Sequence, residues 1–412
     1  MPFRTFLAFF LFLAPAFAQK PAAAIFSQIQ EISAGLSEIT GWPMKKAVPS
    51  QILSRASFQR YLESHLNEKS AQRDIYAAEL ALKMFGLIPQ DFNLAKETVD
   101  LLGEQAAAFY DFKKKRLFIL ETTREGSDQH MALVHELAHA LADQRHALGK
   151  YLDKGSPSDD EVTAREAVME GQAQWLTWAY YSKRTGGPAV VPERALAELT
   201  REEGPTTEFP VLASAPLYIR ESLLFPYSTG ARFQDAVFQR MGRPAFEKVF
   251  QRGPQSTQQV MHPDQYFAAK TPTSPLPPSI QHAGPEARNM RRLVEGSVGE
   301  FDHEILLRQY VGKAESKAAA QHWRGGTYRL FEHKKEKYPV LAYASEWDSP
   351  EAAQAYFDLY LRVLQQKWTH MEMASRSRTE ATGSGDSGRF VLRLSGSVVE
   401  SVEGLKPEAS RH

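Results

Sequence analysis

Apolar residues recur at three- and four-residue spacing along much of the chain, and this pattern predicts a mainly helical protein. Helical patterning of this kind extends through the N-terminal region, residues 19–105. A strong amphipathic helix is expected over 128–147. Ser158 and Glu161 have the spacing of a capping box, so they predict the start of another helix, which would end before Gly186.

Two parts of the chain have strand patterning instead. Residues 107–120 carry two apolar runs on either side of a lysine-rich turn, which predicts a β-hairpin. The C-terminal part combines a helix expected over 350–366 with a Ser/Gly/Arg-rich stretch, 374–388, that we expect to be mobile. Its expected strands are 327–331, 340–345 and 390–402.

A proline-rich stretch divides the chain. Four prolines fall within residues 271–279, so we expect a linker over 271–285. It separates a core at 106–270 from a small C-terminal α+β domain at 286–412. The expected fold class is therefore α+β, mainly helical.

The first residues have the pattern of an export signal. Arg4 precedes an apolar run of 13 residues, 6–18, which ends in the small-x-small sequence Ala16-Phe17-Ala18. A membrane span needs about 20 residues, so the run is too short to be an anchor. We expect a signal peptide over 1–18, a secreted or periplasmic location, and no stable membrane span after cleavage.

Composition excludes several kinds of chemistry. The 49 basic and 49 acidic residues balance, so charge gives no reason to expect a nucleic acid partner. The chain has no cysteine, which removes disulfides, thiolate catalysis and cysteine-ligated metals. Any metal must therefore be held by His, Asp or Glu.

One short run carries the strongest chemical signal. In His135-Glu136-Leu137-Ala138-His139 the two histidines are four residues apart, so on a helix both imidazoles share a face and can bind one ion. Glu136 directly follows His135, where its carboxylate can reach a water molecule bound to the ion. Chance would produce this pattern roughly 0.03 times in a chain of this composition.

A catalytic zinc site usually needs a third protein ligand. A third histidine in metzincin register is absent, because Arg145 occupies that position and Ala142 occupies the glycine position. The next expected helix offers Glu166 and Glu170, which share a face. We favour Glu170 as the ligand, since its neighbours are apolar or small, and expect Glu166 to support it.

The motifs resemble those of a known enzyme clan. Residues 135–144, HELAHALADQ, with Glu170-Gly171-Gln172-Ala173 downstream, are similar to gluzincin zinc metallopeptidases. More narrowly, they resemble an uncharacterised group of exported bacterial proteins with HExxHALxDQ and E-G-x-A motifs. Val168-Met169 precede the ligand Glu, where thermolysin-type sequences carry an Asn. Weaker similarity covers Phe109-Tyr110-Asp111, Phe225 to Gly230, Ser256 to Pro263 and Trp347-Asp348-Ser349.

The resemblance implies a zincin-like catalytic core with an HExxH helix and a small edge hairpin, acting on a peptide or protein substrate. It implies Zn²⁺ as the cofactor, with Glu136 as the general base. The implied zinc ligands are His135, His139 and Glu170.

Several roles stay open at this stage. Tyr227 and His262 lie in the weaker motifs and are candidates to stabilise the oxyanion, although Tyr227 could be a packing ring and His262 a helix cap. Asp143 could hold a ligand imidazole, or it could cap or pair elsewhere. The protein could also be a catalytically silent zinc-binding interaction protein, or a zinc hydrolase of a non-peptide amide or ester.

Overall fold

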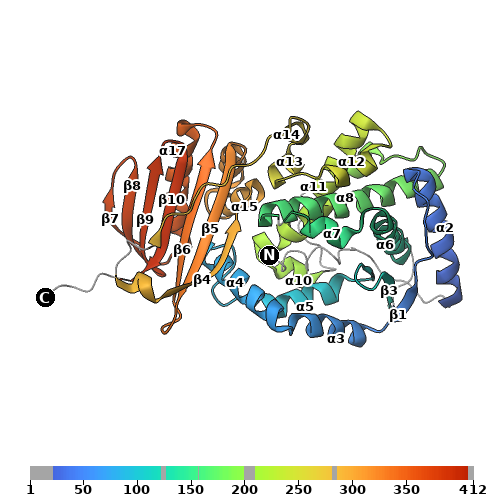
Figure 1. Cartoon of the computed structure of the whole chain (residues 1–412), viewed down its shortest axis with the longest axis horizontal. Coiled ribbons are helices and arrows are strands. Elements are labelled where there is room, and N and C mark those ends of the chain that lie inside the picture. The colour runs from blue at the N-terminus through green and yellow to red at the C-terminus, as the bar shows by residue number, and fades with distance from the viewer. Residues whose placement is uncertain (1–21, 122–126, 156, 199–208, 281–284, 407–412) are drawn as a thin grey trace.

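The computed structural model describes residues 22–121, 127–155, 157–198, 209–280 and 285–406 (Figure 1). The chain is α+β and mainly helical, as predicted: a helical part carries a small sheet, and a larger antiparallel sheet forms a separate C-terminal domain. The expected signal peptide, 1–18, lies outside the described residues. Within the described ranges, no helix is both long enough and apolar enough to cross a bilayer.

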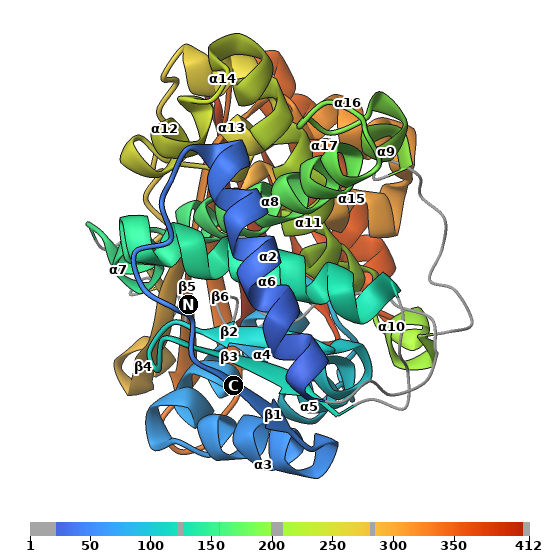
Figure 2. The same ribbon diagram turned by 90° about the vertical axis from the view of Figure 1, so that its right-hand side faces the viewer.

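The N-terminal region is helical except for one short strand. That strand, β1 (Ser50–Leu53), pairs in parallel with β3, and the helical prediction for this region missed it. Helix α2 packs across α6 and α8 (Figure 2). The helices of this region are α2 (Ala22–Thr40), α3 (Arg55–Leu66), α4 (Lys69–Phe85) and α5 (Leu94–Gln105).

The predicted hairpin is confirmed. It consists of β2 (Ala108–Asp111) and β3 (Arg116–Leu120), and in the three-stranded sheet, ordered β1-β3-β2, strand β2 lies at an edge. Phe109 and Phe118 face each other across the hairpin and stack at 4.9 Å between ring centroids. They pack with Phe58 of α3 in a small separate core, which fixes one face of the hairpin.

Two long helices follow the hairpin. They are α6 (Ser127–His146) and α8 (Asp159–Arg184), and both were predicted. The side chain of Ser158 accepts a hydrogen bond from the Glu161 N–H, which confirms the expected start of α8. Residues of α8 are buried on all sides for most of its length, because α6 covers one flank and α11 another.

Shorter helices complete the helical part. Helix α11 contains Pro226 inside its length, and α8 and α11 form the most extensive helix contact of the described chain. The remaining elements are α7 (Leu148–Asp153), α9 (Glu193–Glu198), α10 (Pro210–Ser214), α11 (Leu217–Met241), α12 (Ala245–Gln251), α13 (Thr257–Met261) and α14 (Pro263–Phe267).

The C-terminal domain is a sheet covered by helices. Its strands follow the order β4-β5-β6-β10-β9-β8-β7 and pair antiparallel (Figure 1). The elements are η2 (Pro285–Asn289), β4 (Met290–Ser297), α15 (Glu300–Val311), α16 (Lys313–Ala320), β5 (Trp323–His333), β6 (Pro339–Trp347), α17 (Pro350–Lys367), β7 (Glu372–Arg376), β8 (Glu380–Gly385), β9 (Gly388–Ser395) and β10 (Val398–Leu405).

Most predictions for this domain hold, with one correction. The strands expected at 327–331 and 340–345 and the helix beginning at Pro350 are present, and the strand character expected over 390–402 is confirmed by β9 and β10. The expectation that 374–388 is mobile is wrong, because most of it forms β7 and β8. Pairing with β9 satisfies the backbone of β8, so tertiary context overrides the Ser/Gly-rich composition.

The two parts share a continuous apolar core. Phe85 of α4 makes edge-on ring contacts with Tyr328 and Tyr343 of the sheet, at 5.5 and 5.4 Å. The described part of the expected linker is also tied down, since the Thr273 N–H donates to the Arg324 carbonyl at 2.8 Å. The sheet is thereby held against the helices that carry the site.

Candidate metal site

Three buried side chains converge between α6 and α8. The Nε2 atoms of His135 and His139 are 3.1 Å apart, and Oε2 of Glu170 lies 3.0 Å from the first and 3.1 Å from the second. These are the residues expected as ligands, and together they form a group that could hold a metal ion. The four-residue spacing on α6 and the packing of α6 against α8 bring them together.

The triangle has the dimensions of a tetrahedral site. Zinc holds nitrogen and oxygen ligands at about 2.0–2.1 Å, so two tetrahedral ligands lie about 3.3 Å from each other. The observed separations of 3.0–3.1 Å are close to that value. The second oxygen of Glu170, Oε1, is buried without a hydrogen-bond partner in the described structure, which suits a carboxylate that awaits a cation. The residues present therefore fit a bound metal ion.

Burial and the charges of the three residues on one another shift their pKa values. Burial lowers the pKa of His135 to about 4, which keeps this imidazole neutral. Burial acts to raise the pKa of Glu170, but the two histidines outweigh it and lower the pKa to about 2. The pKa of His139 is raised, because Glu170 outweighs the opposing effect of burial.

Glu136 lies beside the group and contacts the edge strand. Its Oε2 accepts a hydrogen bond of 2.7 Å from the backbone N–H of Tyr110 in β2. The side chain is only 4% exposed, and burial raises its pKa to about 8. A carboxyl group with a pKa in this range can both take and return a proton near neutral pH.

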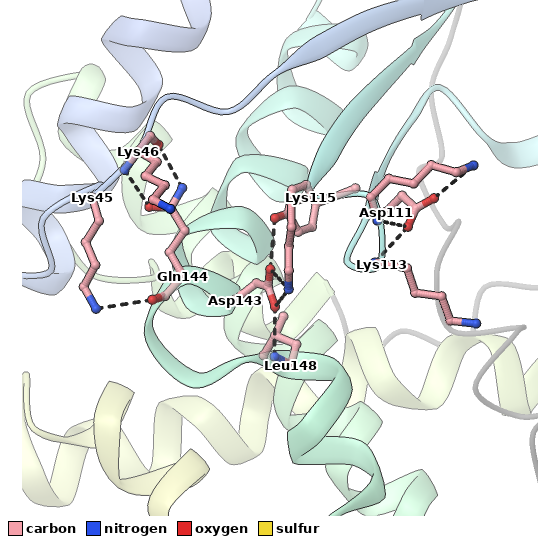
Figure 3. A network of polar contacts seen from close by, with 10 residues as sticks. Lys45, Lys46, Asp111, Lys113, Lys115, Asp143, Gln144 and Leu148 are labelled. Carbon is pink, nitrogen blue, oxygen red and sulfur yellow. Dashed lines mark hydrogen bonds and ion pairs between the residues drawn. The ribbon is translucent and has the colours of Figure 1, made fainter.

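Asp143 forms hydrogen bonds with the hairpin and with the start of α7. Its carboxylate accepts a hydrogen bond from the Tyr110 hydroxyl at 2.9 Å. It also accepts from Lys115 Nζ at 2.8 and 2.6 Å (Figure 3). It also accepts from the Leu148 N–H at 3.0 Å, which caps α7. Among the described residues, the hydrogen bonds of Asp143 go to the hairpin and to Leu148, and its charge acts on the ligand candidate His139 by raising the pKa of that imidazole. Asp143 thus lies one helical turn after His139 and binds the hairpin through Tyr110 and Lys115.

On α8, the neighbours of Glu170 differ in their contacts. Glu166, one turn earlier, is buried but is not a member of the potential ligand group. Gln174, one turn later, interacts with His135 through its side chain. Gln174 was not among the site residues predicted from the sequence. Its four-residue spacing from Glu170 was the available signal, since it puts both side chains on one face.

The two oxyanion candidates have different surroundings. Tyr227 of α11 stacks on the His135 ring, with centroids 5.6 Å apart and planes inclined by 25°. His262 instead pairs with Glu300 of α15, Nε2 to Oε1 at 2.6 Å, and its imidazole remains 40% exposed. The structure brings Tyr227 to the metal group and records Glu300 as the partner of His262.

Comparisons with known proteins address only the C-terminal domain. A family model described as "Domain of unknown function (DUF8575)" matches residues 288–411, which span the second sheet and its helices. No curated protein matches the chain, and no solved structure matches it.

Proposed function

We propose that the protein is a zinc-dependent metallopeptidase that works outside the cytoplasm, in a secreted or periplasmic location. The observation that carries the proposal is the buried triangle of His135, His139 and Glu170 with Glu136 directly beside it. Two imidazoles and one carboxylate are a frequent ligand set of catalytic zinc. His135, His139 and Glu170 would hold the ion.

The metal and the protein would divide the work. Bound zinc supplies a Lewis acid that polarises a carbonyl and acidifies water. Glu136 takes the proton from the water that attacks the peptide carbonyl and passes it to the leaving amine. The Tyr110 N–H orients the Glu136 carboxylate for this transfer, since it occupies Oε2.

Tyr227 is the candidate for a second stabiliser of the oxyanion. Its ring lies against His135 and the residue is only 8% exposed, so Tyr227 shares the buried environment of the ligands. A hydrogen-bond donor in such an environment stabilises developing negative charge strongly, because water does not compete.

The test uses the mature protein loaded with zinc and casein as an unstructured substrate. Glu136→Gln should keep the wild-type metal content while cleavage falls by roughly 10²- to 10⁴-fold, the usual contribution of a general base. The exposed residue Glu351 provides a matched control, and Glu351→Gln should cleave as the wild type does. Chelation should abolish cleavage and added zinc should restore it.

Three results would reject or narrow the proposal. Full activity in Glu136→Gln would reject the general-base assignment. A wild-type protein that binds zinc but cleaves no peptide would favour a silent zinc-binding protein. Product analysis that found only small amides or esters cleaved would favour the non-peptide hydrolase.

A further inference from the structure

Tyr110 contacts helix α6 at two points. Its backbone N–H donates to Glu136 at 2.7 Å, and its hydroxyl donates to Asp143 at 2.9 Å. Glu136 and Asp143 are seven residues apart, which is about two helical turns or 10 Å along the axis. One residue of the edge strand is therefore held to the ligand helix through both its backbone and its side chain.

Lys115 adds a second attachment from the same hairpin. Its Nζ lies within hydrogen-bond distance of both Asp143 oxygens, at 2.8 and 2.6 Å (Figure 3). The Asp143 side chain is 1% exposed, whereas that of Lys115 is 55% exposed. A carboxylate this deeply buried requires its partners, because an unpaired buried charge strongly destabilises the folded state. The turn of the hairpin is thereby tied to the end of α6.

The same turn has a constrained backbone. Lys115 has φ of +52°, a left-handed conformation that residues with a Cβ rarely adopt. The Asp111 carboxylate accepts from the N–H groups of Lys113 and Lys114, both at 2.9 Å, which closes the turn. The bond to Asp143 then fixes where this closed turn lies relative to α6.

We infer that Asp143 is a positioning residue for Glu136 and acts through Tyr110 and Lys115. By holding the hairpin against α6, it keeps the Tyr110 amide in line with Oε2 of Glu136. The Tyr110 amide fixes Oε2 of Glu136, so Oε1 is the oxygen that takes the proton in the proposed reaction. The catalytic consequence rests on the proposed function, while the positioning itself is a structural claim.

The chain allows the hairpin contacts to be removed without the helix cap. Asp143 also caps α7 through Leu148, so replacing Asp143 would mix two effects. Tyr110→Phe and Lys115→Met each remove one hairpin contact and leave the cap in place. Lys115→Arg keeps the cation and serves as the conservative rescue. Lys113→Met is the matched control, because the exposed Lys113 side chain belongs to the same turn.

Two measurements are needed for each variant in the zinc-loaded protein. The first is hydrogen exchange of the peptide that contains Tyr110. Exchange of this amide should become faster in Tyr110→Phe and Lys115→Met, and stay as in the wild type in Lys113→Met. The second is casein hydrolysis. We expect kcat to fall roughly 10- to 100-fold, as for a misplaced catalytic group, with KM and zinc content unchanged. Lys115→Arg should recover most of both properties.

The outcomes separate the two proposals. Unchanged exchange and unchanged kcat in both hairpin variants would overturn the positioning inference. A lower kcat that persists at full size in the Glu136→Gln background would also overturn it, because the effect would then not pass through Glu136. If the wild type shows no hydrolysis at all, the proposed function fails, and amide exchange alone decides whether Asp143 positions Glu136.

Discussion

The backbones of Gly171 and Gly230 meet where α8 crosses α11. A Cβ atom placed on Gly171 would lie 2.1 Å from the carbonyl carbon of Gly230, and one on Gly230 would lie 2.2 Å from the Ala167 carbonyl oxygen. Only glycine permits such an approach. Gly171 directly follows Glu170 on α8, and Gly230 lies three residues after Tyr227 on α11. The crossing therefore sets how close Glu170 and Tyr227 come to each other.

The crossing predicts a large cost for a single methyl group. Gly171→Ala should separate α8 from α11, lower the free energy of unfolding by at least about 1–3 kcal/mol, and weaken metal binding as Glu170 shifts. Gly103→Ala on α5 is the control, because a Cβ atom added at Gly103 would meet no neighbouring heavy atom within 4 Å. The control should gain about 0.5–1 kcal/mol. Denaturant unfolding and a chelator competition measure the two effects, and equal behaviour of the variants would contradict the prediction.

The Glu170 carboxylate completes the metal group, and Glu166 does not. Glu170→Gln should therefore lose zinc from the purified protein, while Glu166→Gln, an equally buried neighbour on the same helix, should keep it. Loss of a residue that hydrogen-bonds to a metal ligand typically reduces metal affinity 10- to 100-fold, so loss of a ligand itself should exceed that range. Metal analysis after dialysis measures both, and retention by Glu170→Gln with loss by Glu166→Gln would reassign the ligand.

Much of the candidate site could be predicted because its parts are local. Periodicity alone puts His135 and His139 on one face of a helix, and an acid among small and apolar residues indicates a buried Glu170. The contacts that hold the site depend on residues distant in sequence. Asp143 and Lys115 are 28 positions apart, and no spacing rule predicts that pair. The orientation of Glu136 therefore required the structure.

In the overall fold, too, elements with a local sequence signal were predicted, whereas elements that depend on distant residues were missed. Long helices were predicted well, because apolar periodicity over many residues is a strong signal. Strand β1 is four residues long, lies between helices, and gains its stability from β3, more than sixty positions away. Its own pattern is too short to indicate a strand. The pair β7–β8 was missed for the opposite reason, since its composition suggested mobility and its neighbour β9 orders it.

A buried histidine predicts that acid destabilises the C-terminal domain. The ring of His303 donates through Nδ1 to the Gly299 carbonyl at 2.7 Å and accepts at Nε2 from the Tyr343 hydroxyl, and burial lowers its pKa to about 4. In the unfolded chain a histidine takes up its proton below about pH 6.5. Between pH 6.5 and 4 the unfolded state therefore binds more protons than the folded state. The free energy of unfolding should decrease by up to roughly 3 kcal/mol as the pH is lowered through this range.

The comparison that isolates this effect is a difference in slope. His303→Gln should flatten the dependence of the unfolding free energy between pH 6.5 and 4, whatever its stability at neutral pH. His370→Gln, at a side chain that is 87% exposed, should keep the wild-type slope. Urea unfolding at several pH values provides the data, and an unchanged slope in His303→Gln would show that other groups cause the acid sensitivity.

Substitutions of Tyr227 and His262 should affect hydrolysis in opposite ways. Tyr227→Phe keeps the ring that stacks on His135 at 5.6 Å but loses the hydroxyl, so zinc content should hold while kcat falls roughly 10²- to 10³-fold, as when an oxyanion donor is removed. His262→Gln should leave hydrolysis nearly unchanged and cost stability only, because its partner is Glu300. A fully active Tyr227→Phe together with an inactive His262→Gln would transfer the oxyanion role to His262, and α13 would then have to approach the metal group during the reaction.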